Sequence, residues 1–245
     1  MRLDVYLFEK GLAHSRTDAK ALITEERIFV DGKLVTKPSY NVEDGAKVSV
    51  KEGGVRYVSR GGIKLEAALS EFSVDPSGRA CLDVGSSSGG FTDCLLKHGA
   101  ARIIAVDSGR DQLAESLRCD GRIFLMEGCN ARYLTSDMLP FVPSLAVMDV
   151  SFISATYIIP AVYNCLAEGG EFISLIKPQF EVGRGGVGKG GIVKDDKKRT
   201  EAVKKVTDFA VQTGFDVVGT IRSPIEGGDG NIEFLAHFKK KRREG

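Results

Sequence analysis

One stretch of the sequence, ACLDVGSSSGGFTDCLLKHGAARIIAVD at residues 80–107, decides the fold. An apolar run ends at Asp83, and a glycine-rich turn at residues 85–90 follows at once. A helical segment then leads to a second apolar run, which ends at Asp107. This order of strand, turn, helix and strand predicts half of a nucleotide-binding α/β sheet, in which ligands lie beyond the carboxyl ends of the strands.

The glycine spacing and the terminal acid favour one cofactor. The spacing is G-x-x-x-G-G rather than the G-x-G-x-x-G of dinucleotide sites. Glycines let the backbone approach a ligand closely, and an acid at the position of Asp107 accepts hydrogen bonds from a ribose diol. S-adenosylmethionine has a ribose but no phosphate group for a glycine-rich loop to bind, so the turn predicts this cofactor. A tight turn without a ligand is the alternative.

The composition is that of an ordinary globular protein. The chain has 245 residues, of which 42% are hydrophobic and 27% charged, and its net charge is +1. Nucleic-acid binding therefore has to come from local patches rather than from overall charge. The apolar runs are too short to span a bilayer, so no membrane contact is expected. The five cysteines form no C-x-x-C pair, which disfavours a metal site and favours a reducing compartment, the cytoplasm.

Residues 1–50 have the pattern of a small α+β module. Helical apolar spacing occurs at 2–10 and 17–24, and a hairpin is predicted at 27–35 around Asp31-Gly32, a pair typical of type I′ turns. A short strand is predicted at 47–50. The module resembles the S4 RNA-binding domain over its whole length. In the S4 arrangement, basic side chains gather on one face to contact phosphates; the candidates are Arg2, Arg16, Lys20, Arg27 and Lys33.

Residues 51–62 are predicted to be a glycine-rich basic linker, in which Arg60 is a further RNA-binding candidate, and residues 63–245 a second domain. A helix at 63–72 precedes seven predicted strands, at 80–84, 102–106, 123–126, 145–148, 171–176, 215–221 and 231–238. Further helices are predicted at 90–98, 111–119, 155–166 and 197–213. The alternation predicts a parallel sheet covered on both faces, whereas the short last connection permits only an antiparallel hairpin. This combination resembles the class I methyltransferase fold.

Four charged residues are candidates for chemistry in this domain. Asp149 ends the fourth strand, Lys177 ends the fifth, Glu233 lies in the last strand, and Lys64 lies in the first turn of the helix before the sheet. Methyl transfer to a ribose 2′-hydroxyl needs a base, because an alcohol is a poor nucleophile near neutral pH, and a lysine among other charges can take that proton. The sequence after Asp149 lacks the prolines and aromatic residue typical of amino-group methyltransferases, which disfavours a base nitrogen as target. A solvated strand end is the alternative for each residue alone.

Nearly the entire chain resembles the TlyA family, S4-fused ribosomal RNA 2′-O-methyltransferases with an FtsJ-like catalytic domain that are often labelled hemolysins. The resemblance rests on residues 58–110 and on the segments DVSFIS and LIKPQFE. It implies a tetrad in which Lys177 is the base, Asp149 and Lys64 tune its basicity and place the hydroxyl, and Glu233 positions the lysines. It also implies a cytidine ribose of ribosomal RNA, free or in a subunit, as the target. The cofactor-binding residues that it implies are Asp83, Gly85, Ser86, Ser87, Gly89, Gly90, Phe91, Asp107 and Asn130.

Other functions are weighed against this one. Residues 183–189, GRGGVGK, match the P-loop pattern, but Gly190 stands where the magnesium-binding hydroxyl belongs, so a flap carrying Arg184 and Lys189 near the substrate is expected instead. A membrane-acting hemolysin is the competing class, and a catalytically inactive RNA-binding protein is a third. The glycine spacing and the antiparallel last strand disfavour an NAD-dependent enzyme. The sequence leaves the modified nucleotide and the oligomeric state open.

Overall fold

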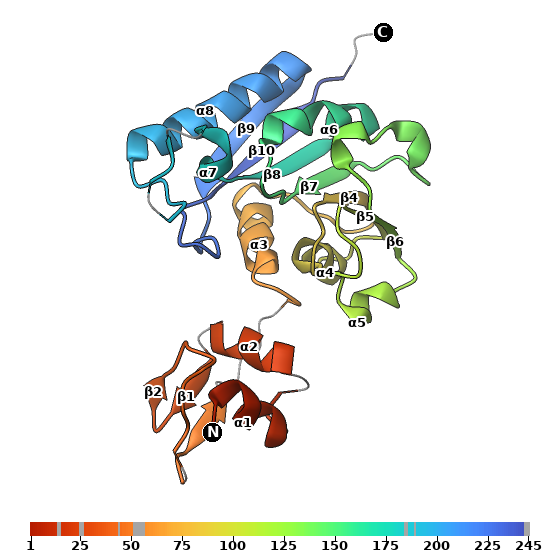
Figure 1. Cartoon of the computed structure of the whole chain (residues 1–245). Helices are drawn as coiled ribbons and strands as arrows, with labels where there is room; N and C mark the ends of the chain where they lie inside the picture. Colours follow the sequence, from red (N-terminus) through yellow and green to blue (C-terminus); the bar gives the residue numbers. More distant parts are fainter. Residues whose placement is uncertain are drawn as a thin grey trace. The chain divides into compact units, whose positions relative to one another are not determined.

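The computed structural model describes residues 1–13, 16–24, 27–43, 45–50, 57–183, 186–188 and 190–242. The chain divides into two compact units, Met1–Gly54 and Val55–Gly245 (Figure 1). Residues Arg184 and Lys189 of the expected flap, and residues 51–56 of the expected linker, lie outside the described residues. Among the helices that are described, none combines the length and the apolar character needed to cross a membrane.

The first unit packs two helices against a three-stranded sheet. Its elements are α1 (Leu3–Glu9), α2 (Arg16–Thr24), β1 (Ile28–Val30), β2 (Lys33–Leu34) and β3 (Val48–Val50). Strand β1 lies between β2 and β3 and is antiparallel to both. Asp31 and Gly32 have φ angles of 50° and 76°, the two positive values that a type I′ turn requires, as the sequence predicts. The core holds Leu3, Leu7 and Ile23, which are fully buried.

The second unit is built on a seven-stranded sheet in the order β6-β5-β4-β7-β8-β10-β9. The strands are β4 (Ala80–Val84), β5 (Arg102–Asp107), β6 (Ile123–Glu127), β7 (Leu145–Met148), β8 (Glu171–Ile176), β9 (Phe215–Arg222) and β10 (Phe234–Lys240). Neighbours from β6 to β8 are parallel, whereas β10 is antiparallel to both β8 and β9. The predicted parallel sheet with an antiparallel last strand is therefore confirmed.

Helices cover both faces of this sheet (Figure 1). The α-helices are α3 (Gly61–Glu71), α4 (Gly90–Lys97), α5 (Glu115–Arg118), α6 (Ile159–Cys165), α7 (Pro178–Glu181) and α8 (Asp196–Thr213), and the short 3₁₀ turns are η1 (Ala131–Tyr133), η2 (Ser136–Met138) and η3 (Ala155–Tyr157). Side chains of α3, α4 and α5 share one core with Cys81, whereas side chains of α6 and α8 share the other with Leu82. Consecutive residues of β4 thus face opposite layers, which is why the strand is apolar throughout.

The structure differs from the sequence expectations in four places. Tyr57, expected in the linker, is only 2% exposed and packs in the core of the second unit, where a Cβ on Gly62 would lie 2.2 Å from it. The helix expected at 111–119 is limited to α5, because Asp111 has a φ of 56° and Ala114 is extended, with a ψ of 139°. The helix expected at 155–166 is divided into η3 and α6, with Pro160 in the first turn of α6. The last strand begins at Phe234, so Glu233 directly precedes it.

Candidate active site

The sheet reverses its direction of winding between β4 and β7, which places a crevice at their carboxyl ends. Gly85 follows β4 and Asp149 follows β7. Gly85 has a φ of 83°, and a Cβ at this position would lie 2.5 Å from the carbonyl oxygen of Asp149. Only glycine fits here, because any side chain would force the two strand ends apart.

The turn after Gly85 is fixed by the end of β5. The amides of Gly85 and Ser86 donate to the carbonyl of Val106, at 2.8 and 3.1 Å. The Asp107 carboxylate accepts hydrogen bonds at both oxygens, from the Ser87 amide and from the Gly109 amide, each at 2.7 Å. Each oxygen keeps a second lone pair, so the carboxylate is held in one orientation and can still accept from a ligand.

A cavity of about 460 Å³ opens beside this turn. Its lining includes Gly85, Ser87, Asp107, Asn130, Asp149 and Phe152. A second, adjoining cavity of about 220 Å³ shares Gly85, Ser87 and Asp149 with the first and is also lined by Ser86, Gly90 and Phe91. The hydroxyl oxygen of Ser86 is buried and has no hydrogen-bond partner among the described residues.

The residues present fit S-adenosylmethionine. The fixed carboxylate of Asp107 can accept from a ribose diol, and Gly85 keeps the backbone open; both line the larger cavity. Ser86 lines the smaller cavity, and its buried hydroxyl has a hydrogen bond that no described residue uses. The cofactor-binding residues implied by the sequence divide accordingly. Most of them line one of the cavities, whereas Asp83 and Gly89 line neither. Gly89 begins α4 with a φ of 96°, and a Cβ on it would clash with Leu117.

Asp83 is fully buried at the end of β4, beneath the glycine-rich turn. The Thr92 hydroxyl donates to Oδ2 of Asp83 at 2.5 Å, while Oδ1 has no partner among the described residues. Burial raises the pKa of Asp83 to about 7, and the nearby carboxylate of Asp149 adds to this effect. Asp83 thus links β4 to Thr92 of α4, the helix that follows the glycine-rich turn.

The four charged residues expected from the sequence form two ion pairs. Lys177 Nζ lies 2.5 Å from Oδ1 of Asp149 and donates to the Ser151 hydroxyl at 2.7 Å. Lys64 Nζ donates to Oε2 of Glu233 at 2.5 Å, and this pair is almost completely buried. Lys64, Asp149 and Lys177 all line the smaller cavity.

Local backbone geometry explains how these residues meet. Lys177 ends β8, and Pro178 begins α7 directly after it. Glu233 is accommodated by a glycine, since a Cβ on Gly227 would lie 2.5 Å from its Oε1. Arg60, expected to bind RNA, is exposed and donates to the carbonyl of Glu226 at 3.0 Å. The segment between β9 and β10 is therefore held against the start of α3, where Lys64 lies.

Sequence reasoning missed Phe152. Its ring is 92% exposed at the mouth of the larger cavity, and its φ of 64° is unusual for a bulky residue. The Phe180 ring lies 5.2 Å from it. The position of Phe152 just after the end of a strand was the available signal, but the sequence does not show that the chain turns its ring outward.

Sequence reasoning also missed Glu181, which is buried between three segments. Its Oε1 accepts a hydrogen bond from the Ala155 amide at 2.8 Å, and its Oε2 accepts from the Ser154 hydroxyl at 2.6 Å and from Lys205 Nζ at 3.0 Å. It therefore joins α7, which follows Lys177, to the segment that follows Asp149 and to α8.

Two of the basic candidates of the first unit, Arg2 and Arg16, contact the buried carboxylate of Asp4. Arg2 Nε donates to Oδ1 of Asp4 at 3.0 Å, and Arg16 Nη2 donates to Oδ2 at 3.3 Å. These contacts, that of Arg2 above all, lower the pKa of Asp4 to about 2. Both arginine side chains are still more than half exposed. Among the remaining candidates, Lys20 and Lys33 are exposed and Arg27 is partly buried.

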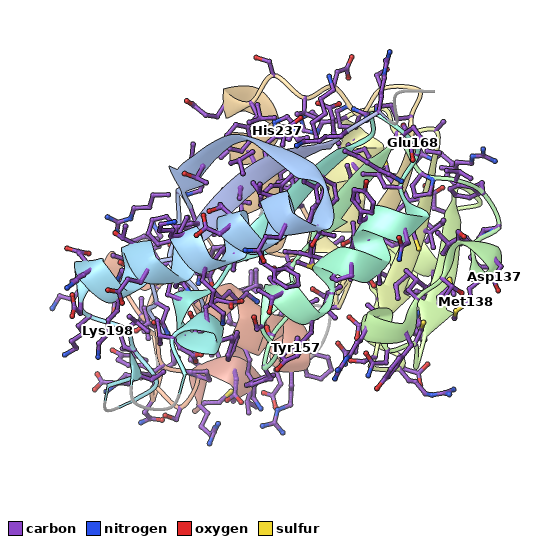
Figure 2. The ribbon with its side chains drawn as sticks, turned by 90° about the horizontal axis from the view of Figure 1, so that it is seen from above. Asp137, Met138, Tyr157, Glu168, Lys198 and His237 are labelled. Carbon is purple, nitrogen blue, oxygen red and sulfur yellow. The ribbon has the colours of Figure 1, made fainter. Side chains whose placement is uncertain are left out.

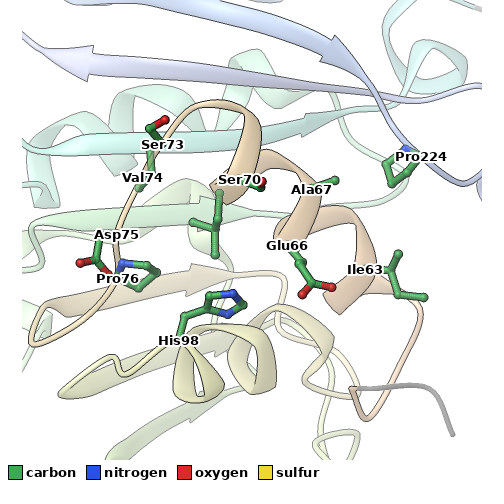
Figure 3. A pocket seen from close by; sticks show the side chains of 11 residues that line it. Ile63, Glu66, Ala67, Ser70, Ser73, Val74, Asp75, Pro76, His98 and Pro224 are labelled. Carbon is green, nitrogen blue, oxygen red and sulfur yellow. The ribbon is translucent and has the colours of Figure 1, made fainter. Parts of the chain in front are cut away.

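A larger hollow, of about 760 Å³, lies elsewhere on the second unit (Figure 3). The side chains of Glu66, Asp75 and His98 line it, together with residues of α3. It contains neither Asp107 nor any member of the two ion pairs. The chemistry therefore points to the smaller cavities at the strand ends.

The strand order, the glycine turn and the fixed acid define a class I methyltransferase. Comparison with known families agrees. Residues 57–240 match the FtsJ-like methyltransferase family and residues 1–48 match the S4 domain. The chain belongs to the FtsJ-like methyltransferase family and carries an S4 domain. The predicted fold, the methyltransferase class and the dependence on S-adenosylmethionine are confirmed.

Relatives extend over the whole chain. The 16S/23S rRNA (cytidine-2′-O)-methyltransferase TlyA of Mycobacterium tuberculosis is 42% identical over 96% of this chain and 88% of its own. Hemolysin A of Brachyspira hyodysenteriae is 43% identical over 97% of this chain and 99% of its own. A solved structure named "Putative hemolysin from Streptococcus thermophilus" is 43% identical, covers 98% of this chain and 88% of its own, and has a TM-score of 0.79. The resemblance to the TlyA family is confirmed.

Proposed function

We propose that this protein transfers a methyl group from S-adenosylmethionine to the 2′-hydroxyl of a cytidine in ribosomal RNA. One observation carries the proposal: two lysine–carboxylate pairs converge at a polar cavity that adjoins the cavity of Asp107. The S4 unit and the specificity of the TlyA relative support ribosomal RNA and cytidine. We place the enzyme with its substrate in the cytoplasm.

Lys177 is the proposed base. Its amine lines the cavity and its side chain is 11% exposed, so a ribose hydroxyl can reach it. S-adenosylmethionine, when bound, supplies the activated methyl group. Lys177, in its neutral form, takes the proton of the 2′-hydroxyl, while Asp149 and Ser151 hold the amine in place through the contacts at 2.5 and 2.7 Å.

Lys64 and Glu233 have a different proposed role. Lys64 is committed to Glu233 in a nearly buried pair, so its charge is fixed beside the reacting groups. A fixed positive charge stabilises the negative charge that develops on the ribose oxygen as its proton leaves. Glu233 orients that charge. The division gives a proton acceptor, Lys177, and a buried ion pair, Lys64–Glu233, at the same cavity.

Phe152 has a proposed role in binding the target nucleotide. An exposed ring at the mouth of the cavity offers a face on which a base can stack. In the S4 unit, Arg2 and Arg16 are proposed to contact RNA phosphates, together with Lys20, Arg27 and Lys33. Arg60 is proposed to extend this contact to the second unit.

The test is methyl transfer from labelled S-adenosylmethionine to 16S and 23S transcripts and to ribosomal subunits that lack ribose methylation. We expect label in the RNA with the wild-type chain and transfer slower by at least about a hundredfold with Lys177→Met. Lys204→Met, which removes a 71% exposed lysine on α8 outside the cavity, is the matched control for loss of charge and should retain transfer. No label in any RNA, despite measurable cofactor binding, would overturn the proposal. Leakage of dye from liposomes would instead support the hemolysin names of the relatives.

A further inference from the structure

A second group of exposed aromatic side chains lies beside the larger cavity. Tyr133, in η1, is 67% exposed, and Tyr157, in η3, is 54% exposed. The guanidinium carbon of Arg132 lies 4.9 Å from the ring centroid of Tyr157 and 5.8 Å from that of Tyr133. One cation thus bridges two rings from segments that are distant in sequence. We refer to Arg132, Tyr133 and Tyr157 as the tyrosine–arginine platform.

The platform is anchored to the walls of the cavity. Asn130 and Ala131, which line it, directly precede Arg132, and Ile158, which also lines it, directly follows Tyr157. The Asn130 side chain accepts a hydrogen bond from the Arg132 amide at 3.1 Å. The hydroxyl of Ser154 similarly accepts from the Thr156 amide at 3.3 Å. Both short helices are thus capped, which holds the backbone of Tyr133 and Tyr157 in place.

The side chains themselves remain available to a partner. Tyr157 lies on the segment that leads into α6 (Figure 2), and it is 54% exposed. Arg132 is exposed, and within the described part of the chain no carboxylate forms an ion pair with it. A single exposed aromatic side chain needs no explanation. Two exposed rings that share one cation, at the edge of a cavity, instead indicate a binding surface.

This surface fits an unpaired nucleobase of a single-stranded RNA segment. Bases stack on tyrosine rings and on guanidinium planes, and the positive charge attracts the neighbouring phosphate. The target nucleotide itself has to reach Lys177 in the smaller cavity, and none of the three platform residues lines that cavity. Because Phe152 is proposed to stack the base of the target nucleotide, we assign the platform to a neighbouring nucleotide.

We propose that the tyrosine–arginine platform stacks an unpaired base that neighbours the target nucleotide, and so helps to select the RNA segment that is methylated. The inference rests on the proposed function. It adds a contact on the catalytic unit itself, independent of the S4 unit. Because stacking accepts every base, the platform selects for an open, single-stranded segment rather than for a particular base.

The test compares RNA affinity with cofactor affinity in the full-length protein. In the double variant Tyr133→Leu/Tyr157→Leu, bulk is kept and the rings are lost. We expect its dissociation constant for 23S or 16S transcripts to rise by roughly tenfold or more, the loss associated with one stacked base. The dissociation constant for S-adenosylmethionine, measured by calorimetry, should change by less than about twofold. Tyr133→Phe/Tyr157→Phe should retain near wild-type affinity for RNA.

Two further variants sharpen the result. Arg132→Gln should weaken RNA binding and reduce its dependence on salt by about one ion, as for loss of a phosphate contact. Phe124→Leu, which changes a 46% exposed ring on β6, is the control for loss of an exposed aromatic and should leave RNA affinity unchanged. Circular dichroism verifies that each variant folds.

Two outcomes would overturn the inference. Unchanged RNA affinity in the folded double leucine variant would show that no base stacks there. A parallel loss of S-adenosylmethionine affinity would assign the tyrosines to the cofactor site instead. Failure of the proposed function is distinguishable from both, because it would appear as absent methyl transfer by the wild-type chain, whereas the binding comparison does not require turnover.

Discussion

The buried carboxyl of Asp83 makes folding stability depend on pH. Its pKa is about 7 in the folded chain, against an ordinary value of 3.8. At a pH between these two pKa values, Asp83 is protonated in the folded chain and ionised in the unfolded chain. The free energy of unfolding therefore falls as the pH rises from about 4 to about 7. Above about pH 7 both states are ionised and the cost is constant, at about 4 kcal/mol. Burial is the cause, because Oδ1 has no described partner to stabilise the charge.

The variant Asp83→Asn removes this charge and keeps the shape of the side chain, including an oxygen that can accept from Thr92. We expect the variant to gain stability relative to the wild type as pH rises from 5 to 8.5, by about 3 kcal/mol. Urea denaturation of the full chain, followed by circular dichroism at both pH values, measures the difference. The comparison between the two proteins cancels the other titrating groups.

A stability difference that is the same at pH 5 and at pH 8.5 would refute this reasoning. A second measurement does not depend on the variant. The carbonyl stretch of a protonated carboxyl in the infrared spectrum should disappear from the wild-type protein as pH is raised through about 7. Its disappearance below pH 5 would show that Asp83 is ionised in the fold.

Three further substitutions test the site. Lys177→Met should lower the rate of methyl transfer at least about a hundredfold, the usual value of a general base, with cofactor affinity intact by calorimetry; Lys177→Arg should not rescue it, because a guanidinium does not lose its proton, and rescue would contradict the assignment. Asp107→Asn should weaken S-adenosylmethionine binding about tenfold or more, because the asparagine oxygen can accept a hydrogen bond from only one of the Ser87 and Gly109 amides and the side chain is no longer held in place. RNA affinity, measured in a filter-binding assay, should stay the same. Glu181→Gln should lower the free energy of unfolding by about 2–4 kcal/mol and slow transfer, because one donor and Lys205 lose their partner; unchanged denaturation would contradict its structural role.

The sequence was sufficient for the parts of the fold that depend on local pattern. Strands β4, β7 and β8 have the predicted bounds because each is a buried apolar run that ends at a polar residue or a glycine. The antiparallel last strand followed from the shortness of its connection. The convergence of Lys64, Asp149, Lys177 and Glu233 was implied by family resemblance, since no spacing rule joins residues so far apart in the chain.

Other features depend on tertiary contacts or on backbone strain. The glycine-rich and basic pattern of residues 51–62 is typical of a linker, but the ring of Tyr57 packs into the core in the space that Gly62 leaves open. Glu181 binds partners 26 and 27 residues away, and Phe152 adopts a positive φ that its residue type disfavours. The expected helix is absent over residues 111–114, because Asp111 adopts a left-handed conformation and Ala114 an extended one. None of these contacts leaves a periodic trace in the sequence.

The central claim is the chemical identity of the methylated atom. The most direct measurement is alkaline hydrolysis of ribosomal RNA that the wild-type chain has labelled from S-adenosylmethionine, followed by mass spectrometry of the fragments. A methyl group on the 2′-oxygen prevents cleavage of the adjacent phosphodiester, so we expect the label in an alkali-resistant dinucleotide that contains 2′-O-methylcytidine. Label in a mononucleotide with a methylated base would contradict the account.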